Sequence, residues 1–254
     1  MLDRVLTTLG SSRTPDVPAR AIWTEAITVA ALVTGLVTLA SAFLPDRSVA
    51  TTVGLVFFGA TWITVWRGDD ERVIRFGLDF GGLVLPGHLD FRRLGREAVR
   101  AVLWALALAA VCFPLFYLGF RGWARWVWHV KHAFALLPPA AGHSASDVAA
   151  QLLIVALPEE AFYRGYLQTR LDEAWTPRLR VLGADIGPSI LVTSAIFALG
   201  HFATIHEPAR LAVFFPSLLF GWLRARTGGI GASMTFHMMC NVYSQALGRG
   251  YGLY

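Results

Sequence analysis

Residues 99–120 read VRAVLWALALAAVCFPLFYLGF, and a single charged side chain, Arg100, interrupts this apolar stretch. About 20 consecutive apolar residues are the length that an α-helix needs to cross the hydrocarbon core of a bilayer. The composition agrees, because 55% of the residues are hydrophobic and only 15% are charged, whereas soluble domains carry about 25% charged residues. The sequence therefore predicts an integral membrane protein and excludes a disordered chain, which would need more charge.

Six further runs of apolar residues follow the same pattern. They cover residues 22–44, 49–66, 148–158, 186–205, 211–223 and 230–247. Continuous apolar runs are typical of membrane helices, whereas the strands of a membrane barrel alternate apolar and polar residues. We therefore predict an all-α, polytopic transmembrane helix bundle of about seven spans, within a range of six to eight. Residues 1–254 are expected to form a single integral membrane domain, with residues 67–100 as its one sizeable soluble loop.

The distribution of basic residues predicts the orientation of the chain. Most of the 22 basic residues, all arginine except Lys131, fall in segments that share one side of the membrane with the N-terminus. Cytoplasmic loops carry such an excess, so we predict a cytoplasmic N-terminus. The net charge of +5 then reflects topology and contact with anionic lipids, and implies no nucleic-acid partner. The arginine-rich composition fits a GC-rich bacterium, which predicts the bacterial inner membrane as the location.

A pair of glutamates lies within the helix predicted to begin near residue 148. Glu159 and Glu160 are adjacent in the segment EEAFYR, which ends at Arg164. Ionisable residues at membrane depth are costly and mark candidate functional sites, although both acids would be unremarkable if the span simply ended there. Glu160 and Arg164 stand four positions apart, so a helix would bring them together as an ion pair. Glu159 points about 100° away and would remain a carboxylate without a cation, suited to act as a general base.

Two later runs carry histidines at membrane depth. His201 follows Gly200 in the run of residues 186–205, and His237 precedes Asn241 by four positions in the last run. His237 and Asn241 would share one face of a helix, where both can donate hydrogen bonds to one point, as in an oxyanion hole. The alternatives are a core histidine at position 201 and a polar clasp between helices at positions 237 and 241. Polar groups on three separate helices favour one shared cavity.

Three motifs in order resemble those of the CAAX protease and bacteriocin-processing family. They are EExxxR at residues 159–164, FxxxH at residues 197–201 and HxxxN at residues 237–241. The segment FPSLLFGWLRARTGGI at residues 215–230 is similar to the usual approach to the last motif in that family. The resemblance covers about residues 148–245, which are expected to be the catalytic helices.

Members of this family are glutamic intramembrane endopeptidases, so the resemblance implies a role for each motif residue. Glu159 and His201 would together hold and activate a water molecule. His237 and Asn241 would stabilise the oxyanion of the tetrahedral intermediate. The implied enzyme is a hydrolase that needs neither a cofactor nor a metal.

The remaining motif residues, Glu160 and Arg164, would shape the site. The resemblance implies hydrolysis of a peptide bond in a membrane-bound protein or peptide, with the lipid bilayer as the surrounding medium. The segment EEAFYRGY at residues 159–166 is similar to the myxosortase-type branch of the family, which trims C-terminal sorting tails.

Other classes of protein account for fewer of these features. Residues 231–234, GASM, lack the last glycine of a rhomboid motif, and Ser233 would share a helix with His237. The zinc-protease motif HExxH is absent, yet Glu159, His201 and His237 are residue types that would suit a metal-dependent version of the protease. The sequence shows neither intramembrane aspartate pairs nor the two similar halves of many transporters. A non-catalytic membrane protein that binds a peptide or confers immunity is the alternative to an enzyme.

Overall fold

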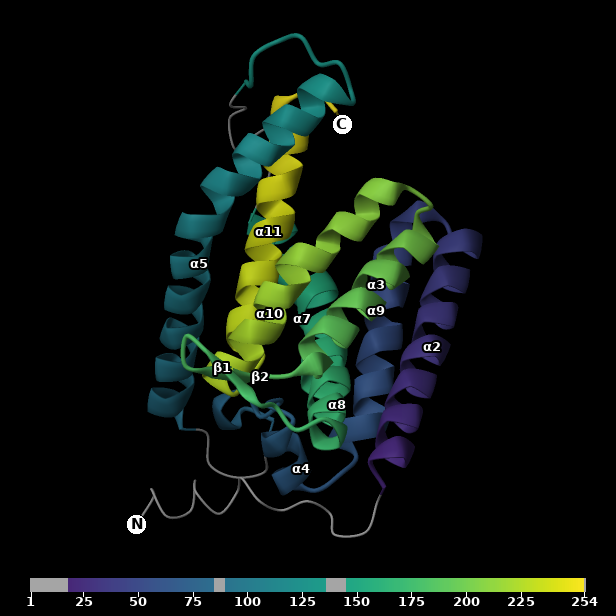
Figure 1. Cartoon of the computed structure of the whole chain (residues 1–254), viewed down its shortest axis with the longest axis vertical. Coiled ribbons are helices and arrows are strands. Elements are labelled where there is room, and N and C mark those ends of the chain that lie inside the picture. The colour runs from purple at the N-terminus through teal and green to yellow at the C-terminus, as the bar shows by residue number, and fades with distance from the viewer. Residues whose placement is uncertain (1–17, 85–89, 136–144, 254) are drawn as a thin grey trace.

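A computed structural model describes residues 18–84, 90–135 and 145–253 of the chain. Long helices run up and down beside one another, and a small hairpin lies at the same end of the bundle as the short helix α4 (Figure 1). Three of these helices are long and apolar enough to cross a membrane: Ala19–Phe43, Asp46–Trp66 and Phe91–Trp126. The predicted all-α membrane helix bundle is therefore confirmed, and further apolar helices pack against these three.

The first two helices form an antiparallel pair. Helix α2 (Ala19–Phe43) begins after Pro18, helix α3 (Asp46–Thr61) begins after Pro45, and the π-helical segment η1 (Trp62–Trp66) prolongs α3. Proline is tolerated directly before and at the start of a helix, because the first N–H groups have no intrahelical partner. The tight connection at Pro45 therefore holds the end of α2 beside the start of α3.

Helix α5 begins earlier than the sequence predicts. Helix α4 (Asp70–Arg75) and the 3₁₀ turn η2 (Phe80–Gly82) precede α5 (Phe91–Trp126). The side chain of Asp90 accepts hydrogen bonds from the backbone N–H groups of the second and third residues that follow it, at 2.9 and 3.0 Å. This N-cap extends the helix into the polar segment, so the prediction of a loop over residues 67–100 is wrong for α4 and for residues 91–100. Residues 85–89 of that loop lie outside the described residues.

The helix that carries the two glutamates is continuous and alternates between α-helical and π-helical segments. Its consecutive segments are α6 (Ala145–Ala150), the π-helical η4 (Gln151–Ala156), α7 (Leu157–Glu160), the π-helical η5 (Ala161–Gln168) and α8 (Thr169–Ala174). The helix therefore continues for fourteen residues beyond Glu160 and does not end at the two glutamates. Stretches of π-helix occur frequently at functional sites.

The C-terminal part begins with a hairpin that the sequence did not predict. Strands β1 (Leu179–Val181) and β2 (Ala184–Ile186) pair antiparallel, and Arg180 lies opposite Asp185. Helices α9 (Pro188–Thr204), α10 (Phe214–Thr227) and α11 (Gly231–Gly250) follow, with the 3₁₀ turn η6 (Pro208–Val213) between α9 and α10. Gly228, at φ 80°, ends α10 in the left-handed conformation that glycine adopts without strain.

Two clusters of buried apolar side chains hold the helices together. One core joins α2, α3, η5 and α9, and its largest buried side chains include Phe57, Phe162, Tyr166 and Phe197. A second core joins α5, α10 and α11 around Phe220 and Phe236. Many large apolar side chains of α2, α3 and α5 are instead exposed, as expected for helices whose outer faces contact lipid.

Candidate active site

The two adjacent glutamates lie on α7, between the two π-helical segments. Glu159 is 8% exposed and Glu160 is fully buried. Ionised carboxylates are costly to bury unless they are paired or hydrogen-bonded. Their partners therefore decide what each acid can do, and the two acids have different partners.

Glu160 forms a buried ion pair with Arg164. Glu160 Oε1 lies 3.0 Å from Arg164 Nη1, and both side chains are fully buried. The predicted pair across one helical turn is confirmed. The same oxygen of Glu160 also lies 2.9 Å from His237 Nδ1, so one carboxylate joins its own helix to α11.

Arg164 also joins this helix to α10. Its Nη2 donates hydrogen bonds to the backbone oxygen of Ser217 at 3.1 Å and to the Ser217 hydroxyl at 2.6 Å. The guanidinium lies 4.8 Å from the ring centre of Phe197 and 5.0 Å from that of Phe220. Cation–π contacts of this kind strengthen when they are desolvated. Arg164 is therefore held by a carboxylate, a serine and two aromatic faces.

His237 lies between the two glutamates. An ionised carboxylate only accepts hydrogen bonds, so the contact with Glu160 assigns the N–H of His237 to Nδ1. The other nitrogen, Nε2, faces Glu159 Oε2 at 3.8 Å. The ring of Phe220 stacks on the imidazole with centres 4.7 Å apart. Glu160 and Phe220 thus fix the ring so that Nε2 points toward Glu159.

Glu159 lines a cleft of about 430 Å³, and its Oε2 has no hydrogen-bond partner among the described residues. The cleft is walled by α2, α3, the segment from η4 to η5 that contains α7, and α9, and its lining also includes His201, Tyr163 and Gly200. Most of the lining is apolar, which is typical of ligand sites of this size. The predicted free carboxylate therefore opens onto a cavity that is large enough for a short peptide segment.

His201 reaches the same cleft from α9. Its Nδ1 lies 3.0 Å from the backbone oxygen of Phe197. A carbonyl oxygen only accepts, so this contact assigns the proton to Nδ1 and leaves the lone pair of the neutral ring on Nε2. His201 can therefore accept a proton or a hydrogen bond at Nε2.

Asn241 and His237 contact different residues of the helix that carries the glutamates. Its Nδ2 donates to Gln151 Oε1 at 3.1 Å, while His237 contacts Glu160, nine positions further along the same neighbouring helix. Both side chains do face that helix, as their spacing predicts. The amide has two N–H groups, so one donor remains after the contact with Gln151.

Three residues of the site were missed by sequence reasoning. Gln151 is the one amide in the apolar run at residues 148–158, and this was a usable signal. Ser217, and Thr34 in the lining of the cleft, gave none, because small hydroxyl residues are common in membrane helices. No group of three His, Cys, Asp or Glu side chains is placed to hold a metal ion within the parts of the chain that the structure describes.

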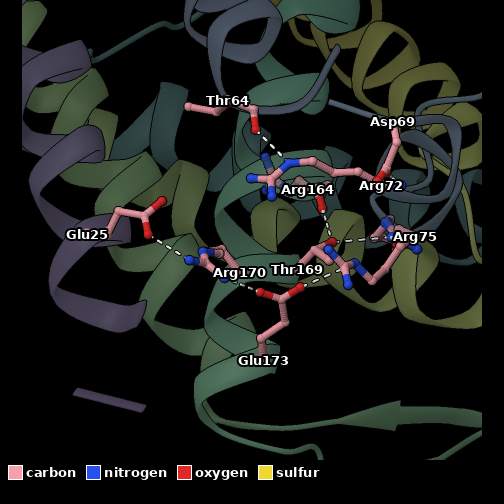
Figure 2. A network of polar contacts seen from close by, with 10 residues as sticks. Glu25, Thr64, Asp69, Arg72, Arg75, Arg164, Thr169, Arg170 and Glu173 are labelled. Carbon is pink, nitrogen blue, oxygen red and sulfur yellow. Dashed lines mark hydrogen bonds and ion pairs between the residues drawn. The ribbon is translucent and has the colours of Figure 1, made fainter. Parts of the chain in front are cut away.

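A second polar network lies at the hairpin end of the bundle, below the site (Figure 2). Arg170 contacts both Glu25 of α2, at 2.6 Å, and Glu173, which in turn lies 3.4 Å from Arg75 of α4. The Thr169 hydroxyl donates to the backbone oxygen of Arg164 at 3.3 Å. This network fastens α2 and α4 to the helix that carries the glutamates and holds the lower end of the site together.

One comparison with known proteins finds a matching family. Residues 141–243 match the family described as type II CAAX prenyl endopeptidase Rce1-like. The match supports the resemblance of this region to the CAAX protease and bacteriocin-processing family. The matched region contains all six polar residues that the motifs single out, and the family consists of membrane-embedded proteases of the hydrolase class. No curated protein and no solved structure matches the chain.

Proposed function

We propose that the chain is an intramembrane endopeptidase in which a water molecule, activated by Glu159 and His201, hydrolyses a peptide bond. The observation that supports the proposal is that the two glutamates have different surroundings. Glu160 is occupied by Arg164 and His237, whereas Glu159 faces the cleft together with His201. A carboxylate and an imidazole in one cavity suit the activation of water by a general base.

The reaction has two steps. Glu159 takes a proton from the water, and the water oxygen bonds to the carbonyl carbon of the substrate as the carbonyl oxygen becomes an oxyanion. His201, with its lone pair on Nε2, accepts a hydrogen bond from the water and orients it. Glu159 then returns the proton to the nitrogen of the leaving amine as the C–N bond breaks. Protons and electrons balance without a cofactor.

His237 and Asn241 are the proposed donors to the oxyanion. Nδ1–H of His237 is used by Glu160, so Nε2 can donate only when the ring carries a second proton. Asn241 would contribute its second N–H while the first stays on Gln151. Donors fixed before the reaction stabilise developing charge most effectively.

The proposed substrate is a membrane-bound protein or peptide. The resemblance of residues 159–166 to the myxosortase-type branch makes C-terminal sorting tails the first substrates to test. We further propose a multi-pass location in the bacterial inner membrane with a cytoplasmic N-terminus, since arginines are concentrated at the hairpin end of the bundle.

Replacing Glu159 by glutamine tests the proposal. Glu159→Gln keeps the shape of the side chain but cannot accept the proton, so cleavage of tail-bearing membrane substrates should fall by about 10²–10⁴. The matched control is Glu97→Gln, an acid on α5 whose side chain is 41% exposed and lies outside the cleft; it should cleave normally. Each reaction is run with and without a strong chelator.

Two results would contradict this mechanism. Equal cleavage by wild type and Glu159→Gln would make Glu159 structural. Loss of wild-type activity with chelator would instead favour the metal-dependent version built from Glu159, His201 and His237.

A further inference from the structure

We infer that substrate enters the cleft from the extracytoplasmic face of the membrane, as an apolar segment without acidic side chains. The inference rests on the proposed function for the presence of a substrate, but the direction of entry follows from the position of the cleft. We take as its mouth the lining residues nearest the helix ends, which are Ser41, Asp46, Thr204 and Ile205. They belong to the end of α2, the start of α3 and the end of α9, which meet at the end of the bundle opposite the hairpin (Figure 1).

The cleft descends from this mouth along two helices. Its lining on α3 runs from Asp46 to Phe57 and on α2 from Thr34 to Ser41. At about 1.5 Å per residue, these stretches span roughly 17 Å and roughly 10 Å of helix. Glu159 is therefore reached from the mouth after two to three helical turns of mostly apolar wall.

The opposite route, from the hairpin end, is filled by packed side chains. Phe162, Tyr166 and Phe76 are fully buried, and the ring of Tyr166 packs against the other two. Beyond them, the network around Arg170 ties α2, α4 and α8 together (Figure 2). A substrate that came from that end would have to displace both layers, whereas the mouth end requires no rearrangement of the core.

The distribution of basic residues indicates which side of the membrane each end of the bundle faces. The hairpin end carries most of the arginines of the described residues, namely Arg20, Arg67, Arg72, Arg75, Arg92, Arg93, Arg96, Arg170, Arg178, Arg180, Arg224 and Arg226. The mouth end carries Arg47, Arg121, Arg125, Lys131, Arg210 and Arg249. By the positive-inside rule the hairpin end is cytoplasmic, so the mouth opens on the other side.

The chemistry of the lining selects the class of substrate segment. Its ionisable members are Asp46, Glu159 and His201, with no lysine or arginine among the described lining residues. An acidic substrate residue would therefore be repelled by like charge in a site that offers no cation. Apolar side chains would instead contact the valines of α2 and α3. The site accordingly suits the outer end of a membrane-anchored segment.

Thiol labelling tests the side of entry without requiring a known substrate. In a background with Cys112→Ala and Cys240→Ala, Ser41→Cys places a thiol of nearly the same size in the cleft. A charged, membrane-impermeant thiol reagent is applied to right-side-out and to inside-out vesicles. Ala42→Cys, adjacent but outside the lining, is the matched control for lipid exposure, and Asp70→Cys on α4 marks the hairpin end.

We expect Ser41→Cys to be labelled in right-side-out vesicles and Asp70→Cys only in inside-out vesicles, while Ala42→Cys stays unlabelled. Labelling of Ser41→Cys only in inside-out vesicles would overturn the inference, and so would its failure to react in either preparation. If Ser41→Cys does not accumulate, Ala50→Cys, also in the lining and exposed, replaces it. Labelling is independent of cleavage, so this experiment and the Glu159→Gln experiment can fail separately.

Discussion

Replacing Arg164 by methionine should strongly destabilise the protein. The change keeps much of the side-chain volume but removes the cation that lies 3.0 Å from Glu160 and 2.6 Å from the hydroxyl of Ser217. Glu160 is fully buried and would keep only His237 as a partner. Removing one member of a buried ion pair costs about 3–5 kcal/mol, since the other charge stays buried without its partner.

The assay is thermal unfolding of the detergent-solubilised protein at a fixed heating rate. For a chain of this size about 3–5 kcal/mol corresponds to a decrease in apparent Tm of roughly 6–20 °C. The matched control is Arg75→Met, because the Arg75 side chain is 39% exposed and lies 3.4 Å from Glu173. An exposed ion pair contributes about 0–1 kcal/mol, so the control should shift Tm by at most a few degrees.

A double variant isolates the cause of the destabilisation. Glu160→Gln combined with Arg164→Met removes both charges, so it should be more stable than Arg164→Met alone. If Arg164→Met unfolds at the wild-type temperature, or if removing Glu160 as well lowers Tm further, the buried ion pair is not what holds these helices together.

Two further predictions concern the cleft and the proposed oxyanion site. A Cβ at Gly200 would lie 3.3 Å from Tyr163 Oη, so the larger side chain of Gly200→Leu should crowd the cleft. Overpacking of this kind costs about 1–3 kcal/mol, which corresponds to a decrease in kcat/KM of roughly 5–150-fold. The control is Gly119→Leu, where nothing lies within 4 Å, and an equal effect of both variants would refute the assignment. Asn241→Ala should lower kcat by about 10²–10³. Gln151→Ala removes one neutral hydrogen bond and should lower kcat by less than about tenfold. Single-turnover rates of both variants test this, and an unchanged rate in Asn241→Ala would exclude Asn241 as an oxyanion donor.

The regular parts of the fold could be predicted from sequence because they depend on local properties. Apolar runs of about 20 residues fix membrane helices wherever they occur. The helix boundaries were harder to predict, because they depend on single capping groups such as the Asp90 side chain. The hairpin at residues 179–186 was missed, since its two short strands of three residues each carry too little pattern to be recognised.

The sequence by itself determined the membrane helices, the order of the three motifs and the pairing of Glu160 with Arg164, which follows from the four-residue spacing of a helix. Only the tertiary structure decided which helix each polar side chain meets. Arg164 contacts Ser217 across 53 positions, His237 contacts Glu160 across 77, and Asn241 contacts Gln151 across 90. No periodicity along the chain encodes such contacts, because they arise from how the helices pack. The same packing decided which side chains line the cleft beside Glu159.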